Sequence, residues 1–385
     1  MTRTITVKDV QLFPIAMPFV ERLRTSFGEE PFKTAIIVAL HTDEGITGWG
    51  ECSAEIHPGY SYETMGTAMH VMSEFLAPAL LGKRISDATE IPSLIGKTRG
   101  HPLAKHAIEA AVWDALAKAN NQTLAQAFAA HLPAGHDSRG YANVGVSIGI
   151  KPTIEDTISI IAKRVGEGYG RIKLKIQPGW DVELARGVRQ AFPDIVLMLD
   201  ANSAYTLADA DHLKQVDEFN LLMLEQPLGH DDVYEHSKLQ PQLTTPICLD
   251  ESILSADDTR MALELGACKI INLKPARVSG YSESLEIYKV CVEHGTPLWI
   301  GGLMETGIGR AANVAFASLP GVTLPCDISA TSRYYIQDLT EPPFELQLNS
   351  RLNVPSGLGI GVTVVEDRVE QASALWREQY PYQQS

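Results

Sequence analysis

The chain has 385 residues, of which 45% are hydrophobic and 21% are charged, a balance typical of soluble globular proteins. Its formal net charge of −15 argues against nucleic acid or an anionic membrane as a partner, because both attract basic surfaces. The chain lacks a run of roughly 18 apolar residues and the apolar core of a signal peptide, and its five cysteines form no CxxC pair. We therefore predict a cytoplasmic protein without membrane spans, disulfides or zinc.

The first part of the chain is predicted to be an α+β module. Ile5 to Pro14, Lys33 to Thr42 and Thr47 to Cys52 have the composition of strands. From His106 to Ala119, apolar residues recur at helical spacing, which predicts a helix with one buried face. We expect these strands and helices to pack together as one unit.

The middle of the chain repeats a short apolar run followed by a segment of helical length. Three of these runs end in Asp200, Glu225 and Asp250, and the same step of 25 residues reaches back to Lys175. A step of 24 residues leads forward to Lys274. Such a period is typical of βα units in a parallel sheet. The sequence therefore predicts a (β/α)7β barrel of the TIM type, in which all strand ends meet at one mouth.

Further strands complete this barrel and follow it. Tyr141 to Ile150 is predicted as the first barrel strand, Leu298 to Ile300 as the seventh and Val322 to Cys326 as the eighth. Phe344 to Leu348 and Val362 to Val364 are expected to be strands that pack back on the first module. The chain is accordingly divided into residues 1–130, an N-terminal α+β module; residues 131–327, the barrel; and residues 328–385, a segment that returns to the first module.

The three acids at the strand ends indicate a metal site. Asp200, Glu225 and Asp250 would lie on adjacent strands, where carboxylates repel one another unless a cation lies between them. Three oxygen ligands with open positions suit Mg²⁺, for which Mn²⁺ can substitute. A single acid would more simply cap the helix after its strand, but three in register favour the metal.

The lysines complete a set of groups suited to proton transfer. Lys173 and Lys175 lie two apart on one strand, so both side chains point into the barrel mouth, and Lys274 lies on the opposite side. Nearby cations should lower the pKa of a lysine toward the working pH. A metal that holds a substrate carboxylate stabilises the enediolate left when the α-proton departs. The pattern therefore indicates α-proton abstraction, leading to either racemisation or dehydration.

A hydrolase motif has to be weighed against this interpretation. Gly145, Ser147 and Gly149 match the G-x-S-x-G of a nucleophile elbow. That motif needs a strand, a sharp turn and then a helix, whereas here it lies within a predicted strand. We interpret the match as chance.

The residues named so far resemble those of a known family, the enolase superfamily, and within it the muconate-lactonising subgroup. More narrowly, the chain is similar to the branch of o-succinylbenzoate synthases and N-succinylamino acid (N-acylamino acid) racemases, over nearly its whole length. The segments that carry the likeness are Lys173–Trp180, Asp200–Ser203, Asp250–Ser252 and Gly302–Arg310.

The resemblance implies roles for individual residues. In the synthase, Lys175 would be the base that starts dehydration of a cyclohexadiene carboxylate on the menaquinone pathway, and Lys274 would stabilise the enediolate. In the racemase the two lysines would exchange roles, and Lys173 would assist at the same site. It further implies a small anionic carboxylate substrate, a homo-oligomer, and a capping module that closes the barrel mouth.

Further residues are expected to bind the substrate or to support those that do. The loops Phe19 to Phe27 and Cys52 to His57 of the capping module should touch the substrate, although exposed hairpin loops would look similar in sequence. The residues selected are Phe19, Arg24, Ser147, Asn202, Glu251, Arg277, Gly302, Met304 and Glu305.

Other functions stay open on the sequence alone. Dipeptide epimerases of this subgroup carry Asp-x-Asp after strand eight, where this chain has Asp327-Ile328-Ser329. A cycloisomerase is a second alternative. A third is a barrel that has lost catalysis and only binds a metal, which predicts missing lysines or acids, although all six are present.

Arg277 bears on the choice between the two activities. It follows Lys274 by three residues, and a guanidinium there would influence how that amine gains and loses a proton. An arginine at this position resembles branch members that racemise as well as dehydrate. Its loss is therefore expected to depress racemisation more than dehydration, unless it is a surface residue at the start of the next helix.

Overall fold

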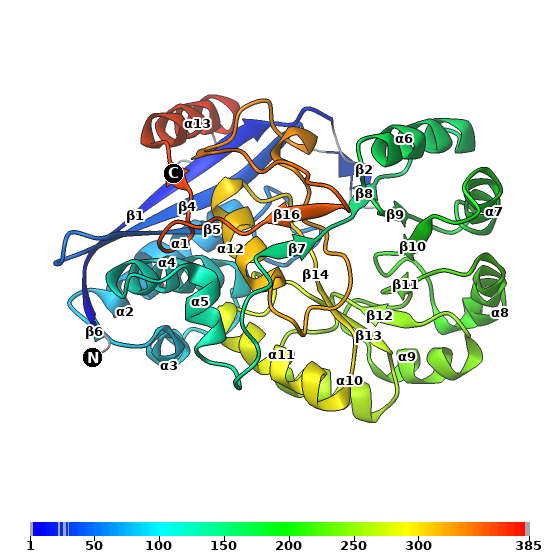
Figure 1. The fold of residues 1–385 in the computed structure, drawn as a ribbon, viewed down its shortest axis with the longest axis horizontal. Helices are drawn as coiled ribbons and strands as arrows, with labels where there is room; N and C mark the ends of the chain where they lie inside the picture. The colour runs from blue at the N-terminus through cyan, green and yellow to red at the C-terminus, as the bar shows by residue number, and fades with distance from the viewer. Residues whose placement is uncertain (1–2, 22–23, 26–27, 30, 382–385) are drawn as a thin grey trace.

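The computed structural model describes residues 3–21, 24–25, 28–29 and 31–381. Figure 1 shows a sheet with its own helices on one side of the molecule and a ring of strands and helices on the other. We call the first the cap and the second the barrel. Their elements come from the parts of the chain that the sequence predicts, while the boundaries at residues 130 and 327 stay a prediction.

An antiparallel sheet is the centre of the cap, with the strand order β5-β4-β1-β6. Three of these strands, β1, β4 and β5, are the predicted ones, and the two-residue β6 was not predicted. The first strand continues to Pro18 because Ile15 to Met17 keep pairing with β4. A separate short hairpin, β2 with β3, follows β1. The strands are β1 (Ile5–Pro18), β2 (Arg24–Thr25), β3 (Gly28–Glu29), β4 (Phe32–Thr42), β5 (Thr47–Cys52) and β6 (Arg84–Ile85).

The long helix α4 packs directly on this sheet. A Cβ added at Gly48 or Gly50 would lie 2.0 Å from a backbone oxygen of α4, so only glycine allows so close an approach. The predicted helix is confirmed, but nearly all its residues are buried, because α4 lies between the sheet and the barrel helix α11. The cap helices are α1 (Met65–Val71), α2 (Ala77–Leu80), α3 (Ile91–Ile95), α4 (Pro102–Ala119) and α5 (Leu124–Ala129).

Seven parallel strands form the wall of the barrel in the order β14-β13-β12-β11-β10-β9-β8. Each strand except the last leads through one α-helix to its neighbour, as the period predicts, and short 3₁₀ helices extend the connections from β10 to β11 and from β11 to β12. The strands are β8 (Val146–Ile148), β9 (Arg171–Lys175), β10 (Val196–Asp200), β11 (Leu224–Glu225), β12 (Ile247–Leu249), β13 (Ile270–Leu273) and β14 (Leu298–Ile300).

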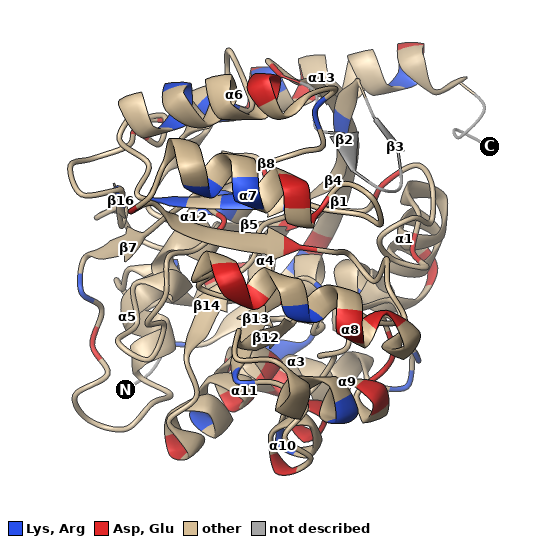
Figure 2. Cartoon of the chain, turned by 90° about the vertical axis from the view of Figure 1, so that its right-hand side faces the viewer, with Lys and Arg blue, Asp and Glu red and all other residues tan. Residues whose placement is uncertain are grey.

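The barrel helices surround these strands. Figure 2 shows acidic and basic positions mixed along the outer helices, as expected of faces turned to solvent. Among the described residues, no helix is long and apolar enough to cross a membrane. The helices are α6 (Ile154–Gly166), α7 (Val182–Ala191), α8 (Ala210–Leu213), α9 (Tyr234–Leu239), α10 (Ala256–Glu264), α11 (Tyr281–His294) and α12 (Gly307–Ala317).

The first and eighth barrel strands differ from the prediction. Tyr141 to Ile150 splits into β7 (Tyr141–Asn143) and β8, and β7 pairs with β16 (Arg351–Asn353) instead of with the barrel wall. Val322 to Cys326 is no regular strand, because Pro325 cannot donate to a ladder. Isolated bridges from its two ends, to β14 and to Val144, close the ring.

The C-terminal segment returns to the cap, as predicted, but by other elements. Phe344 to Leu348 is not a strand, because two prolines precede it and a turn at Asn349 and Ser350 follows. The short strand β17 (Thr363–Val364) covers most of the predicted one and pairs with β15 (Thr340–Glu341). Helix α13 (Glu366–Gln379) then packs on β1.

Two buried glutamates of the cap bind the N-terminal ends of barrel helices. Glu51 on β5 accepts hydrogen bonds from the backbone N–H groups of Thr306 and Gly309, each at 3.1 Å, at the start of α12. Glu109 on α4 accepts one from Ser282 N–H, at 2.9 Å, at the start of α11. Helix N-termini carry unpaired N–H groups and a partial positive charge, so both contacts stabilise the cap against the barrel.

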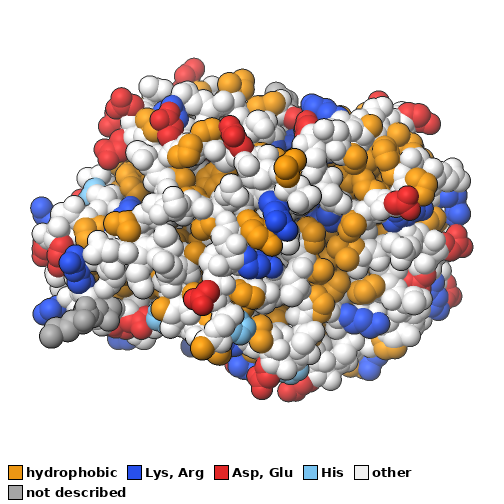
Figure 3. Space-filling view, viewed as in Figure 1, with side chains coloured by type: hydrophobic (Ala, Val, Ile, Leu, Met, Phe, Trp, Pro, Cys, Tyr) orange, Lys and Arg blue, Asp and Glu red, His pale blue; other side chains and the backbone are white. Residues whose placement is uncertain are grey.

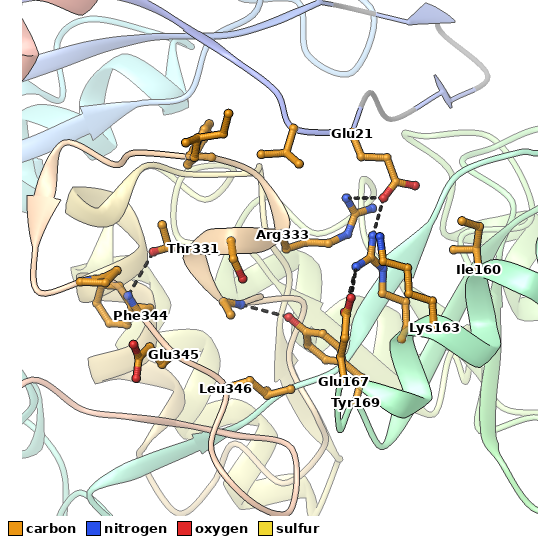
Figure 4. Close-up of a pocket in the computed structure, with 17 residues that line it drawn as sticks. Glu21, Ile160, Lys163, Glu167, Tyr169, Thr331, Arg333, Phe344, Glu345 and Leu346 are labelled. Carbon is orange, nitrogen blue, oxygen red and sulfur yellow. Dashed lines mark hydrogen bonds and ion pairs between the residues drawn. The ribbon is translucent and has the colours of Figure 1, made fainter.

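A third glutamate joins the cap to the barrel. Glu21, which follows β1, forms ion pairs with Arg164 of α6 and with Arg333. Figure 4 shows Glu21 beside Arg333 at the edge of a cavity that all three residues line, and the volume of this cavity is about 780 Å³. Lys151 lies 3.3 Å from the same carboxylate. Burial alone would raise the pKa of Glu21, but Arg333 and Arg164 lower it. This ion-pair cluster fixes the end of β1 to the barrel.

Glu109 makes the stability of the fold depend on pH. Burial raises the pKa of Glu109 from an ordinary 4.5 to about 7, so the folded state binds this proton more tightly than the unfolded chain. Its contribution to stability is therefore complete below the unfolded pKa and is lost as the pH rises through about 7. We expect Glu109→Gln to remove about 3 kcal/mol of this pH dependence. Urea unfolding midpoints across this pH range test it, with the exposed Glu293→Gln as control. Parallel profiles for Glu109→Gln and the unmodified protein would contradict it.

Candidate active site

The structure brings the six predicted acids and lysines together at the carboxyl ends of the barrel strands. In the parallel ladders, Asp200 is the register partner of both Lys175 on β9 and Glu225 on β11. Asp250 follows β12 and Lys274 follows β13. Because neighbouring parallel strands are in register, a regular spacing in the sequence becomes a row of neighbours in space.

The two lysines of β9 have different surroundings. Lys173 is buried, and its Nζ lies 3.1 Å from both Asp200 and Glu225 and 2.5 Å from Asp327. Lys175 donates to Asp200 and to the amide oxygen of Asn202, each at 2.6 Å. The side chain of Lys175 is 12% exposed, compared with 4% for Lys173, so Lys175 is the more accessible of the pair.

On the other side of the barrel mouth, the carboxylate of Asp250 accepts hydrogen bonds from two cationic side chains and from a tyrosine. Its carboxylate accepts from Lys274 Nζ at 2.8 Å and from the guanidinium of Arg277. The hydroxyl of Tyr60, from the cap, donates to Asp250 at 3.3 Å and accepts from Lys274 at 3.0 Å. Burial and the charge of Asp250 raise the pKa of Tyr60 to about 12, so the hydroxyl keeps its proton at neutral pH.

The predicted lowering of a lysine pKa is not found in this geometry. Burial alone would lower the pKa of Lys274, but the carboxylate of Asp250, 2.8 Å away, raises it above its ordinary value. Likewise Asp327, Glu225 and Asp200 outweigh burial and raise the pKa of Lys173. The prediction took account of the cations near each lysine, which disfavour its charged form. In the structure each lysine also forms an ion pair with a carboxylate, which favours the charged form. A divalent cation on the same carboxylates would compete with the lysines and weaken this effect.

The residues present suit a divalent metal in their chemistry. Asp200, Glu225 and Asp250 are 0–1% exposed. Burial and the charge of Asp200 raise the pKa of Glu225, whereas nearby cations lower the pKa values of Asp200 and Asp250, so the three acids are crowded and depend on positive charge at close range. As the side chains stand, no three acidic, histidine or cysteine residues of the described chain have the geometry to hold a metal ion. The reason is that their oxygens face lysines, so the metal site stays a prediction.

A cavity of about 100 Å³ lies between the two walls. It lies between Lys175 and Lys274, and four of the predicted substrate-binding residues line it, namely Ser147, Asn202, Gly302 and Met304. Ser147 Oγ has no hydrogen-bond partner among the described residues, so it is available to a ligand. The lining residues are Glu55, Tyr60, Ser147, Lys173, Lys175, Asn202, Lys274, Gly302, Leu303, Met304, Asp327 and Tyr334.

The other predicted residues lie elsewhere. Glu251 and Arg277 line a neighbouring cavity of about 680 Å³, which meets the first one at Tyr60 and Asn202. Arg277 is 5% exposed and donates to Asp250 and to two backbone carbonyls, so it is no surface arginine.

Three predictions in the loops have different outcomes. Phe19 lies beside Met304 in a small adjoining crevice and stacks on Tyr335, with ring centroids 6.1 Å apart. Glu305 does not line the active-site cavity, because its partly buried carboxylate accepts from Asn313 of α12 at 3.0 Å. The side chain of Arg24 and all of Phe27 lie outside the described residues.

Sequence reasoning missed Tyr60 and the role of Asp327. Tyr60 stands three residues beyond the predicted loop Cys52–His57, in a segment with no periodic signal. The sequence around Asp327 shows only that a second acid is absent, whereas in the structure Asp327 binds Arg171 at 2.6 Å and Lys173 at 2.5 Å. Both contacts join residues far apart in the sequence, which local spacing cannot indicate.

Comparison with known proteins agrees with this site. Residues 4–128 match the family described as mandelate racemase / muconate lactonizing enzyme, N-terminal domain, and residues 158–368 match the family described as enolase C-terminal domain-like. The chain belongs to the enolase superfamily. Enzymes of this superfamily generally depend on a divalent metal.

Similar proteins cover almost the whole chain. It is 46% identical over 367 residues to an o-succinylbenzoate synthase of Geobacillus kaustophilus, covering 95% of this chain and 96% of the relative. It is 46% identical over 368 residues to an N-succinylamino acid racemase of an Amycolatopsis species, covering 95% and 97%. A solved enolase-superfamily member from Listeria innocua superposes with a TM-score of 0.90 at 39% identity, covering 96% and 97%.

The path of the Lys274 side chain depends on one glycine. A Cβ at Gly301, after β14, would lie 2.6 Å from Lys274 Cε and 2.3 Å from Asn272 Oδ1. Gly301→Ala should therefore displace the amine of this enzyme and lower kcat about 100-fold, since small misplacements of a reacting group are costly. Gly166→Ala, at the end of α6 with no atom within 4 Å, is the control. If Gly301→Ala keeps full turnover and an unchanged circular dichroism spectrum, then the position of Lys274 does not depend on the absence of a side chain at residue 301.

Proposed function

We propose that this enzyme abstracts the α-proton of a small carboxylate substrate, and that it acts both as an o-succinylbenzoate synthase and as an N-succinylamino acid racemase. The observation that carries the proposal is the placement of Lys175 and Lys274. Lys175 ends β9 and Lys274 follows β13, two strands that lie opposite each other in the ring, and both lysines line the same cavity. The similarity to enzymes of both names supports the choice of substrates.

The residues divide the chemistry between the two walls. For dehydration, Lys175 removes the α-proton, and Lys274 stays cationic beside the enediolate oxygen that develops. For racemisation, one lysine removes the proton and the other returns one on the opposite face. Asp200, Glu225 and Asp250 would hold Mg²⁺, or Mn²⁺ in its place, which when bound makes the enediolate less costly.

The surroundings of Asp327 disfavour a dipeptide epimerase. Its carboxylate is engaged by Arg171 and Lys173, so it is not free to hold a substrate ammonium. Ser329 supplies no second acid. The face seen in Figure 3 mixes acidic and basic side chains with hydrophobic patches, which gives no support to nucleic acid as a partner. A cytoplasmic homo-oligomer is part of the proposal.

Deuterium exchange tests the two-base assignment. In D₂O the unmodified enzyme should exchange the α-proton of both enantiomers of an N-succinylamino acid, followed by NMR. Lys175→Ala and Lys274→Ala should each abolish racemisation, because each lysine is the acid in one direction and the base in the other. The exposed Lys289→Ala serves as control. A variant lacking either active-site lysine that racemises at nearly the normal rate would overturn the assignment.

The metal proposal has a separate test. Glu225→Gln should weaken binding of Mg²⁺, measured by calorimetry, and remove metal-dependent turnover, because one of three charged ligands is lost. The fold should survive, since Asn272 Nδ2 and Lys173 surround a side chain of nearly the same shape. Chelator-treated protein that keeps full turnover would show that no metal is needed.

A further inference from the structure

Tyr60 is a cap residue that reaches the catalytic wall of the barrel. It lies between β5 and α1, and its hydroxyl accepts from Lys274 Nζ at 3.0 Å. The same amine lies over the face of its ring, 4.3 Å from the centroid. One side chain thus contacts the lysine through a hydrogen bond and through a cation–π interaction.

We propose that Tyr60 is the residue that positions the Lys274 amine for proton transfer, and that the cap thereby controls one of the two bases but not the other. This proposal rests on the proposed function. Gly301 bounds Lys274 on one side, because its missing Cβ leaves the room that Lys274 Cε occupies. Tyr60 bounds it on another side, and Asp250 draws the amine toward the acids.

For the opposite base, Lys175, the hydrogen bonds found among the described residues go to partners in the barrel. These partners are Asp200 and Asn202. The two lysines therefore differ in the module that orients them. Barrel residues orient Lys175, whereas the cap contributes to the orientation of Lys274. The Tyr60 segment is itself fixed in the cap, because Glu63 accepts from Leu103 N–H at 2.7 Å and from Ala104 N–H at 3.1 Å at the start of α4.

Tyr60 also lies where two cavities meet. It lines both the cavity of about 100 Å³ between the lysines and the neighbouring one of about 680 Å³. A side chain in this place keeps the Lys274 amine from turning toward the larger cavity. The hydroxyl has both hydrogen-bonding roles satisfied, since it accepts from Lys274 and donates to Asp250.

Tyr60→Phe removes the hydroxyl contact and keeps the ring. Racemisation should slow about tenfold or more, the usual effect of losing a hydrogen bond to a charged group. Both directions must slow equally, because the equilibrium constant between enantiomers is one. The deciding readout is early α-proton exchange in D₂O, measured on each enantiomer separately. Exchange at the face of Lys175 should stay near the normal rate, while exchange at the face of Lys274 should fall about tenfold.

Further variants separate positioning from a general defect. Tyr60→Leu also removes the ring and should lower exchange at the Lys274 face below that of Tyr60→Phe. Tyr62→Phe, a tyrosine that is 61% exposed in the same segment, should behave as the unmodified protein. Circular dichroism and the thermal midpoint confirm folding of each variant.

The outcomes distinguish this proposal from the proposed function. Equal losses at both faces, or no loss at either, would overturn the role of Tyr60 and leave the two-base reaction standing. If the unmodified protein exchanges neither enantiomer, the racemase function fails and the role of Tyr60 fails with it. A selective loss at one face supports both.

Discussion

The burial of opposite charges at the barrel mouth is the constraint on which the rest of the structure depends. Asp200, Glu225 and Asp250 are almost fully buried, and isolated carboxylates in such a place would be costly. Lys173 and Lys274 compensate them, and both amines are themselves buried. Such a cluster is tolerated only when every group has a partner at close range, so the strands must hold their register and the mouth must be covered.

The cap covers the barrel mouth, and it supplies polar partners as well as apolar surface. Glu51 and Glu109 satisfy N–H groups at the starts of two barrel helices, and Glu21 engages two arginines and a lysine. Lys33 of β4 donates to the carbonyl of Leu303 at 2.9 Å, in the loop that lines the active-site cavity. The cap therefore helps to set the shape of the loops around the cavity, and a change in its sheet can reach the site without touching it.

The sequence was informative wherever neighbours in space are also evenly spaced along the chain. Consecutive parallel strands in register convert a period of 25 residues into a row of side chains, which is why Lys175, Asp200 and Glu225 could be placed together. Contacts between distant segments have no such signature, so Tyr60 could not be found. The predicted eighth strand was wrong because one proline breaks its ladder, and the contact of Glu305 with α12 could not be read from the spacing. The sign of the lysine pKa shift depends on direct ion pairs, which spacing alone does not give.

The surroundings of the two lysines on β9 explain why neighbouring identical residues need not share a role. Lys173 is held by three carboxylates and lies 5.1 Å from the ring of Trp299, so every contact favours its charged form. Lys175 has one carboxylate and one amide oxygen as partners, and its side chain is the more exposed. An amine that must accept a proton from a substrate has to exist without one for part of the cycle. Because Lys175 is the more exposed of the two, it is the better placed to meet a substrate, as its proposed role as a base requires, while the three carboxylates around Lys173 suit a fixed positive charge.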